Sequence, residues 1–198
     1  MAEIPPRLWI VAGPNGSGKS TLYDSTDIEG FGRSVWIINP DRLSAQIAEK
    51  ESLALQQANL AAVRRIESWL HSSVETYQTI GVETVLSTDK YRSLVLKAKQ
   101  HGFEVRLLYV MLSSIALNIQ RVELRIIKGG HAVPNDKITD RHQRSLAQLP
   151  WFLEQADWAQ IYDNSRATPR LVGSKGNSVV SIDPEAPKDL LRALDLSS

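Results

Sequence analysis

The sequence predicts a three-layer α/β fold around a central sheet of five mainly parallel strands. Five short apolar runs lie along the chain, and segments with the helical apolar period of about 3.6 residues separate them. No internal repeat or linker divides the sequence. At 198 residues the chain is long enough for one well-filled core and short for two. We therefore expect one domain over residues 1–198.

Each apolar run has the length of a strand. The runs are residues 8–12 (LWIVA), 34–39 (SVWIIN), 81–87 (GVETVLS), 103–112 (FEVRLLYVML) and 158–162 (WAQIY). The interval 41–79 is expected to hold two helices. Its core positions recur at helical spacing and are Leu53, Leu60, Val63, Ile66 and Leu70. Towards the end, approximately residues 170–196, two apolar pieces around Gly-Ser-Lys-Gly predict a hairpin followed by a closing helix.

The composition is typical of a globular protein. A hydrophobic fraction of 42% and a charged fraction of 23% argue against disorder and fibrous repeats. Basic residues (23) balance acidic residues (22), so net charge does not favour a nucleic-acid partner. Absence of cysteine excludes disulfides and thiolate chemistry. With no signal-peptide pattern and no apolar run near the roughly 18 residues that span a bilayer, we expect a cytoplasmic protein with no membrane partner.

A phosphate-binding loop directly follows the first apolar run. Residues 13–20 read GPNGSGKS and fit the pattern G-x-x-x-x-G-K-[ST], with a strand expected before them and a helix after. The glycines let backbone N–H groups turn towards phosphate oxygens, and the helix start adds its positive dipole end. Lys19 would reach the β- and γ-phosphates, and Ser20 is placed to ligate Mg²⁺. ATP and Mg²⁺ are therefore the expected cofactors. The predicted binding residues are Gly13, Pro14, Asn15, Gly16, Ser17, Gly18, Lys19, Ser20 and Thr21.

Two carboxylates are expected to face the phosphates. Asp41 follows SVWIINP and Glu83 lies in GVETVLS, and the carboxyl ends of parallel strands form the ligand crevice of an open sheet. A carboxylate there accepts a hydroxyl proton in phosphoryl transfer. The fourth run ends in Ser113-Ser114 without an acid, which argues against a motor or switch ATPase. Asp41 could instead cap the following helix, and Glu83 could face an edge of the sheet.

Residues 118–146 carry two pairs of arginines. Arg121 and Arg125 are four residues apart and Arg141 and Arg144 three apart, so each pair shares one helix face. The segment 128–134 (KGGHAVP) breaks the helix between the pairs. This pattern is typical of a lid, approximately residues 121–145, whose arginines close over phosphates and exclude water.

The same residues are also compatible with a solvated pair of charged helices. Glu123, Asp136 and Asp140 would then form surface ion pairs with the arginines. His131, within the break, could contact phosphate or cap the turn. The phosphate loop favours the lid, because a transferred phosphoryl group needs cations around it.

Together these motifs resemble those of the zeta-toxin-like P-loop kinases. The resemblance rests on AGPNGSGKST, INPD, VETVLS, the GGHAVP segment flanked by arginines, and YDNS, and it runs from about residue 8 to 165. It implies a P-loop kinase fold and transfer of the γ-phosphoryl group of ATP. In zeta toxins the aspartate after the second strand deprotonates a sugar hydroxyl of UDP-N-acetylglucosamine, and Asp41 matches that position. The resemblance makes Arg125 and Arg141 the counterparts of the lid arginines and places Asn164 beside the adenine.

One departure concerns the acceptor. Zeta toxins carry a substrate-binding arginine shortly after the third-strand acid, whereas residues 83–87 here read ETVLS. The departure argues against UDP-N-acetylglucosamine itself and makes the chain more similar to a shorter branch of the family.

We therefore expect a kinase acting on a hydroxyl of a small molecule, with a nucleotide sugar as one candidate. The catalytic residues are predicted to be Lys19, Asp41, Arg125 and Arg141, and acceptor binding is assigned to Asp41, Glu83, Arg121 and Arg144. One alternative is a nucleotide-dependent binding module that transfers nothing, as half of a toxin–antitoxin pair with an antitoxin partner. Another is a polynucleotide end kinase, with Arg121, Lys128 and Arg144 on the nucleic-acid backbone, which the near-zero net charge does not favour.

Overall fold

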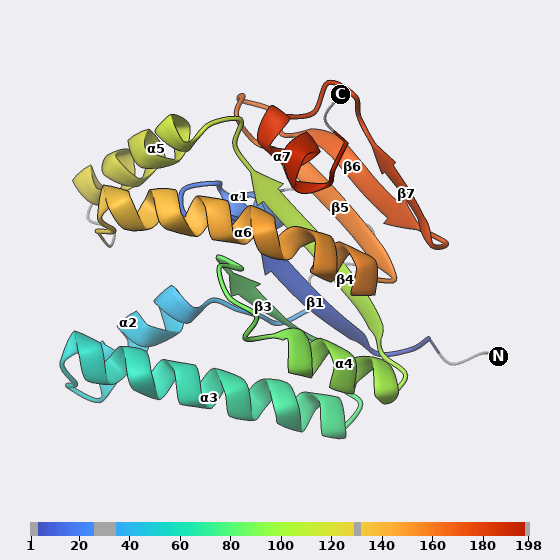
Figure 1. Ribbon diagram of the computed structural model, residues 1–198. Helices are drawn as coiled ribbons and strands as arrows, with labels where there is room; N and C mark the ends of the chain where they lie inside the picture. The colour runs from blue at the N-terminus through green and yellow to red at the C-terminus, as the bar shows by residue number, and fades with distance from the viewer. Residues whose placement is uncertain (1–3, 26–34, 129–131, 197–198) are drawn as a thin grey trace.

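The computed structural model describes residues 4–25, 35–128 and 132–196, arranged around one seven-stranded sheet (Figure 1). The strand order is β2-β3-β1-β4-β5-β6-β7, and the first five strands of that order run parallel. The hairpin β6–β7 continues the sheet antiparallel to β5. The strands are β1 (Arg7–Ala12), β2 (Ile37–Ile38), β3 (Ile80–Thr84), β4 (Glu104–Met111), β5 (Trp158–Asp163), β6 (Arg170–Gly176) and β7 (Val179–Ile182).

The predicted α/β class and mainly parallel sheet are confirmed, but the sheet has seven strands rather than five. The difference arises because the C-terminal hairpin, which the sequence predicted, pairs with β5 through backbone hydrogen bonds instead of standing apart. Sequence periodicity shows that two short strands form a hairpin but not which edge of a sheet they join.

Helices cover both faces of the sheet. They are α1 (Lys19–Ser25), α2 (Pro40–Lys50), α3 (Leu55–Glu75), α4 (Arg92–Gln100), α5 (Ile115–Ile127), α6 (Asn135–Gln155) and α7 (Lys188–Ala193). Apolar residues of α3, α4, α6 and α7 pack on one face in the main core cluster, while Leu22 of α1 packs on the other face with Trp9 and Val11. The two helices predicted for 41–79 are present as α2 and α3.

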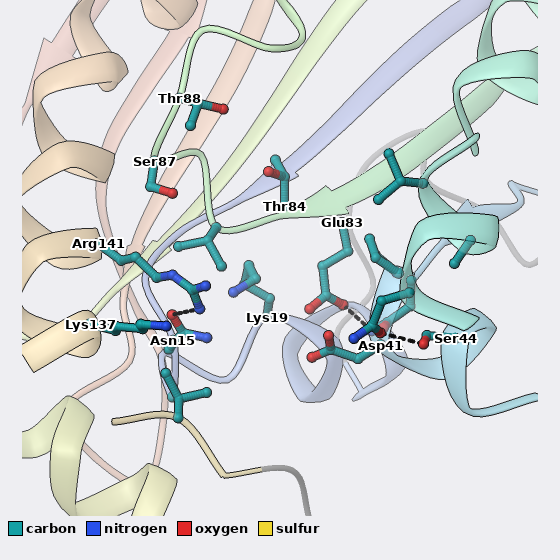
Figure 2. A pocket seen from close by; sticks show the side chains of 18 of the residues that line it. Asn15, Lys19, Asp41, Ser44, Glu83, Thr84, Ser87, Thr88, Lys137 and Arg141 are labelled. Carbon is teal, nitrogen blue, oxygen red and sulfur yellow. Dashed lines mark hydrogen bonds between the residues drawn. The ribbon is translucent and has the colours of Figure 1, made fainter. Parts of the chain in front are cut away.

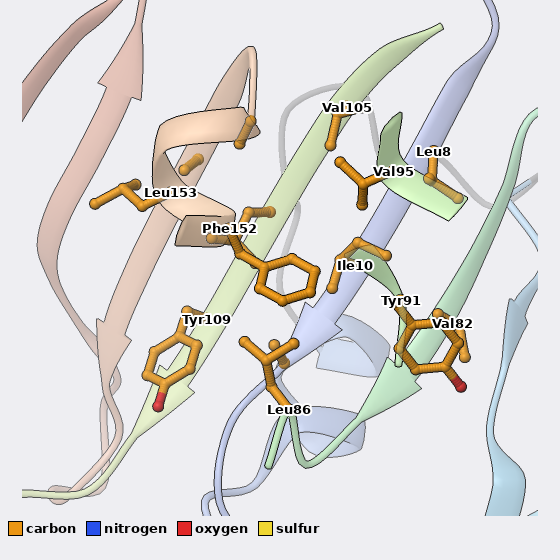
Figure 3. Close-up of a cluster of buried hydrophobic side chains, with 14 of the residues drawn as sticks. Leu8, Ile10, Val82, Leu86, Tyr91, Val95, Val105, Tyr109, Phe152 and Leu153 are labelled. Atoms are coloured by element: carbon orange, nitrogen blue, oxygen red, sulfur yellow. The ribbon is translucent and has the colours of Figure 1, made fainter. Parts of the chain in front are cut away.

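The core is centred on β1, whose residues Leu8 to Ala12 are fully buried. Successive side chains of a strand point to opposite faces, so Leu8 and Ile10 enter the main cluster and Trp9 and Val11 the second one. Phe152 of α6 belongs to the main cluster with Ile10 (Figure 3). Burying a side chain of this size stabilises the fold by about 1.5–3 kcal/mol. The loop after β1 therefore follows directly on a fully buried strand.

Two of the predicted core positions on α3 are wrong. Ile66 and Leu70 are buried, but Leu60 and Val63 are 53% and 38% exposed. The N-terminal half of α3 packs on α2, through Ala58 and Ala62, and not on the sheet. Apolar spacing correctly identified the helix, but the covered face of this half carries Ala58 and Ala62. Val63 lines the cavity described below, and Leu60, two residues from each alanine, lies on another face.

Gly81 offers a test of how tightly the central strands pack. It lies opposite Trp9 of β1 and Ile37 of β2 in the strand register. A Cβ atom here would overlap the Ile37 Cδ1 atom and lie 2.8 Å from the Trp9 Cβ atom. We expect Gly81→Ala to lower the free energy of unfolding by about 1–3 kcal/mol, because over-packing forces neighbouring side chains to shift. Urea denaturation measures this. Gly176→Ala in β6 is the control, since no atom lies within 4 Å of its added Cβ, and an equal loss in both variants would contradict the explanation.

Candidate active site

The loop between β1 and α1 wraps around a point at the carboxyl edge of the sheet. Gly13, Gly16 and Gly18 have φ angles of 140°, 75° and 85°, values that side-chain-bearing residues rarely adopt. At Gly13 a Cβ would also overlap the backbone oxygen of Val110 in β4. These glycines are therefore required by the backbone path, and α1 begins at Lys19, as the motif predicted.

Lys19 is buried beneath this loop. Its Nζ atom donates hydrogen bonds to the carbonyl oxygens of Gly13 at 2.8 Å and Pro14 at 3.2 Å. Burial lowers the pKa of Lys19, and the nearby Glu83 and Asp41 carboxylates oppose that shift. The ammonium group is thus held by carbonyl oxygens of its own loop, at a position where phosphate oxygens could replace them.

Glu83, in β3, joins three other side chains of the site. Its Oε2 atom accepts hydrogen bonds from the Ser20 hydroxyl at 2.8 Å, the Tyr23 hydroxyl at 3.0 Å and the Asn39 amide at 2.8 Å. Burial, with the charge of Glu83 second, raises the pKa of Tyr23 to about 12. The sheet order explains the location: β3 is the neighbour of β1, and Glu83 pairs with Val11 in the register. Glu83 therefore faces the phosphate loop, not an outer edge of the sheet.

Asp41 is not the N-cap of α2, a role that the sequence had left open. The N-cap of α2 is Asn39, whose side chain accepts a hydrogen bond from the backbone N–H of Arg42 at 3.1 Å. Asp41 follows Pro40 in the first helical turn and is exposed to the cavity. Sequence reasoning missed Asn39, although an asparagine directly before proline at a helix start is a typical capping signal.

A cavity of about 570 Å³ brings these residues together (Figure 2). The starts of α2 and α6, part of α3 and the segment after β3 form its walls. In Figure 2, Arg141 and Lys137 approach the phosphate loop from α6, and Glu83 and Asp41 face Lys19 from the other side. Its charged lining residues are the cations Lys19, Lys90, Arg125, Lys137 and Arg141 and the carboxylates Asp41 and Glu83. The excess of cations suits an anionic ligand.

One arginine of each predicted pair lines the cavity. Arg125 of α5 and Arg141 of α6 do so, and the Arg141 guanidinium lies 3.5 Å from the Asn15 side-chain oxygen. Arg121 instead donates to the backbone oxygen of Asn164 at 2.7 Å, and Arg144 is exposed and paired with Asp140. Neither of these two is among the described residues that line the cavity, so their assignment to acceptor binding is not carried forward.

Asn164 contacts the phosphate loop itself. Its side-chain amide donates to the backbone oxygen of Ser17 at 2.8 Å. The residue therefore helps to hold the loop in place, a role that the sequence did not indicate. The predicted glycine hinge at Gly129-Gly130 and the neighbouring His131 lie outside the described residues.

With this geometry in place, the comparison with protein families is decisive. The model of the zeta toxin family matches residues 2–171. The chain belongs to the zeta toxin family. An uncharacterized protein of Haemophilus influenzae (strain ATCC 51907 / DSM 11121 / KW20 / Rd) is 26% identical over an aligned length of 150 residues, and the match covers 70% of this chain and 99% of that protein.

Solved structures share the fold of this zeta toxin family member. A chain of the AvrRxo1-ORF1:AvrRxo1-ORF2 complex with sulphate ions has a TM-score of 0.73 at 17% identity, covering 98% of this chain and 65% of its own length. The same complex with ATP gives a TM-score of 0.72 at 16% identity, with 96% and 63% covered. The PezAT toxin–antitoxin system of Streptococcus pneumoniae gives 0.63 at 18% identity, with 100% and 81% covered. This chain thus spans about two thirds of the AvrRxo1 chains.

The described part of this family member contains neither a membrane-spanning helix nor a cluster of metal-ligating side chains. None of its helices there is both long and apolar enough to cross a bilayer. The described residues also contain no group of three or more histidine, aspartate or glutamate side chains that could hold a metal ion.

The interaction between Glu83 and Tyr23 can be tested through the titration of the Tyr23 hydroxyl. We expect Glu83→Gln to lower the pKa of Tyr23 from about 12, because the variant removes a negative charge that opposes phenolate formation. Burial should keep the pKa above the ordinary value of 10.0. Alkaline difference spectra, with Tyr23→Phe variants in both backgrounds to isolate this phenol, measure the shift. An unchanged Tyr23 titration would show that Glu83 does not act on it.

Proposed function

We propose that the chain is an ATP- and Mg²⁺-dependent phosphotransferase that moves the γ-phosphoryl group of ATP to a hydroxyl of a small molecule. The observation that carries this proposal is the single cavity in which a phosphate loop, its buried lysine, two carboxylates and two arginines meet. Membership of the zeta toxin family and the fold shared with a complex that contains ATP support it.

The phosphate loop and the two arginines are proposed to hold the triphosphate. Lys19 would exchange the carbonyl oxygens of Gly13 and Pro14 for β- and γ-phosphate oxygens. Arg125 and Arg141 approach from α5 and α6 and would neutralise the charge that develops on the transferred group. Arginine suits this position because its planar fork matches phosphate oxygens.

Ser20 and Glu83 are proposed to hold Mg²⁺ together with phosphate oxygens. Both are oxygen donors, which this ion prefers, and their side chains lie 2.8 Å apart. Mg²⁺ would neutralise charge on the β- and γ-phosphates. With Asn39 and Tyr23 also bonded to Glu83, the carboxylate is oriented before any ligand arrives. This assigns Glu83 to the metal, in place of the acceptor-binding role expected from the sequence.

Asp41 is proposed to be the base. It would take the proton of the acceptor hydroxyl while that oxygen bonds to the γ-phosphorus atom, and the bond from this phosphorus to the bridging oxygen breaks to release ADP. Ser87, Thr88 and Lys90 also line the cavity, and their side chains can hydrogen-bond a polar acceptor. The name of the PezAT toxin–antitoxin system supports, in addition, an antitoxin protein as a partner.

The role of Asp41 can be tested with Asp41→Asn. This variant keeps the size of the side chain but removes its ability to accept the hydroxyl proton. We expect ATP affinity to stay within about twofold and phosphoryl transfer to fall by about 10²-fold or more. Transfer of label from γ-labelled ATP into a metabolite extract measures the reaction, and calorimetry measures ATP binding. Undiminished labelling by the variant, or loss of ATP binding, would contradict the assignment.

The two arginines of α6 form a matched pair for testing the nucleotide site. We expect Arg141→Ala to weaken ATP binding roughly tenfold or more, since a hydrogen bond to a charged group is lost. Arg144→Ala should leave ATP affinity unchanged, because Arg144 is exposed and paired with Asp140. Isothermal titration with ATP and Mg²⁺ gives both values. Equal effects of the two substitutions would indicate a general electrostatic contribution and not a specific contact.

A further inference from the structure

A buried chain of polar contacts connects the C-terminal part of the fold to the phosphate loop. Asn118 of α5 is fully buried, and its side-chain amide donates to the backbone oxygen of Asn15 at 2.6 Å. The Oδ1 atom of Asn118 lies 3.1 Å from Nδ1 of His142 in α6, which is 1% exposed. On the other side of the His142 ring, Nε2 lies 3.6 Å from a carboxylate oxygen of Asp189 in α7.

The hydrogen-bond partners fix the direction of this chain. The Asn15 carbonyl can only accept, so Asn118 must present its amide nitrogen there and its oxygen to His142. Nδ1 of His142 must then carry a proton, because two acceptors cannot bond to each other. Each side chain therefore sets the orientation of the next one: reversal of Asn118 would break the contact to the loop, and reversal of His142 would break its contact to Asn118.

The contact with Asn15 also orients the next peptide N–H. In a planar trans peptide the C=O and N–H bonds point in opposite directions. Holding the Asn15 carbonyl towards α5 therefore turns the Gly16 N–H away from α5, and Gly16 lines the cavity. The loop also runs close to the backbone of α5 at this point, since a Cβ added to Gly16 would lie 2.7 Å from the Asn118 backbone oxygen.

Two consecutive residues of α6, Arg141 and His142, act on the side chain and on the backbone carbonyl of Asn15. The guanidinium of Arg141 lies 3.5 Å from the Asn15 side-chain oxygen, while His142 acts on the Asn15 carbonyl through Asn118. Neither Asn118 nor His142 is among the described residues that line the cavity. Both are placed to fix the loop from behind.

We propose that Asn118 and His142 are positioning residues for nucleotide binding: they hold the Asn15 carbonyl so that the Gly16 N–H and Arg141 are set for the triphosphate. The inference rests on the proposed function, because it presumes that the loop binds ATP. It adds a requirement that the phosphate-loop motif does not contain. A merely structural role for these two residues would affect stability without affecting ATP affinity.

The experiment compares ATP binding with stability in matched variants. We expect Asn118→Ala and His142→Ala each to weaken ATP binding about tenfold, the effect of losing one hydrogen bond. The control is Ser145→Ala: Ser145 is also fully buried on α6, and its hydroxyl lies 2.9 Å from that of Tyr109, a residue of the main core cluster. It should lower the urea midpoint and leave ATP affinity unchanged. Calorimetry with ATP and Mg²⁺, and urea denaturation without nucleotide, give both quantities.

Two further variants make the test specific to the chain of contacts. His142→Asn, whose amide nitrogen stands at the same distance along the side chain as Nδ1 and can donate in its place, should bind ATP more tightly than His142→Ala. The double variant Asn118→Ala/His142→Ala should bind ATP no more weakly than Asn118→Ala, since the two residues act in series. If Asn118→Ala does not fold, the two His142 variants decide the matter.

The outcomes separate this inference from the proposed function. If the wild-type chain does not bind ATP, the proposed function fails. If the wild type binds ATP and the Asn118 and His142 variants bind it equally well, the inference alone is overturned. Equal loss of ATP affinity in Ser145→Ala would also overturn it, because the effect would then reflect general destabilisation of α6.

Discussion

The site depends on one carboxylate oxygen, Oε2 of Glu83, at which three structural elements meet. Ser20 and Tyr23 reach it from α1 and Asn39 from the start of α2, while Glu83 itself lies near the end of β3. Hydrogen bonds to an ionised group are about twice as strong as neutral ones, and a partly buried carboxylate needs such partners. Asn39 also caps α2, so the same side chain determines where that helix begins. The position of Asp41, two residues further on, follows from this contact.

Charge in the cavity is balanced only when an anion is bound. Among the described lining residues, five cations face two carboxylates. Burial lowers the pKa of Lys19, and the neighbouring Arg125 lowers it further, although Glu83 and Asp41 oppose both effects. A bound polyphosphate would raise the pKa of Lys19 again, because each negative oxygen near the ammonium group favours its charged form. The site is therefore electrostatically complementary to the ligand that its loop geometry also favours.

Sequence patterns predicted several residues that the structure brings together in the cavity, but not the residues that support them. The phosphate loop, Lys19 and Asp41 belong to the first group, because each lies in a recognisable local pattern. Helical spacing showed that Arg121 and Arg125 share a face but not which one reaches the cavity; four residues advance about 6 Å along a helix, enough to move a guanidinium from the cavity to the back of the loop. Asn118 and His142 had no local signal, because their function arises only when α5 and α6 pack together. Burial of Leu60 and Val63 was overestimated for a related reason: periodicity indicates a helix but not which of its apolar side chains another element covers, and here α2 covers Ala58 and Ala62 while Val63 lines the cavity.

The carbonyl groups of the phosphate loop explain why these supports are needed. A loop can direct its N–H groups at an anion only if its carbonyl oxygens point elsewhere and are satisfied there. Lys19 bonds the carbonyls of Gly13 and Pro14, Asn118 that of Asn15, and Asn164 that of Ser17. A bound nucleotide would draw Lys19 away from the carbonyls of Gly13 and Pro14. Asn118 and Asn164 lie behind the loop and can keep their hydrogen bonds to it. Preorganisation of this kind spares the ligand the cost of ordering the loop, because the peptide planes are already set by side chains from α5 and the end of β5.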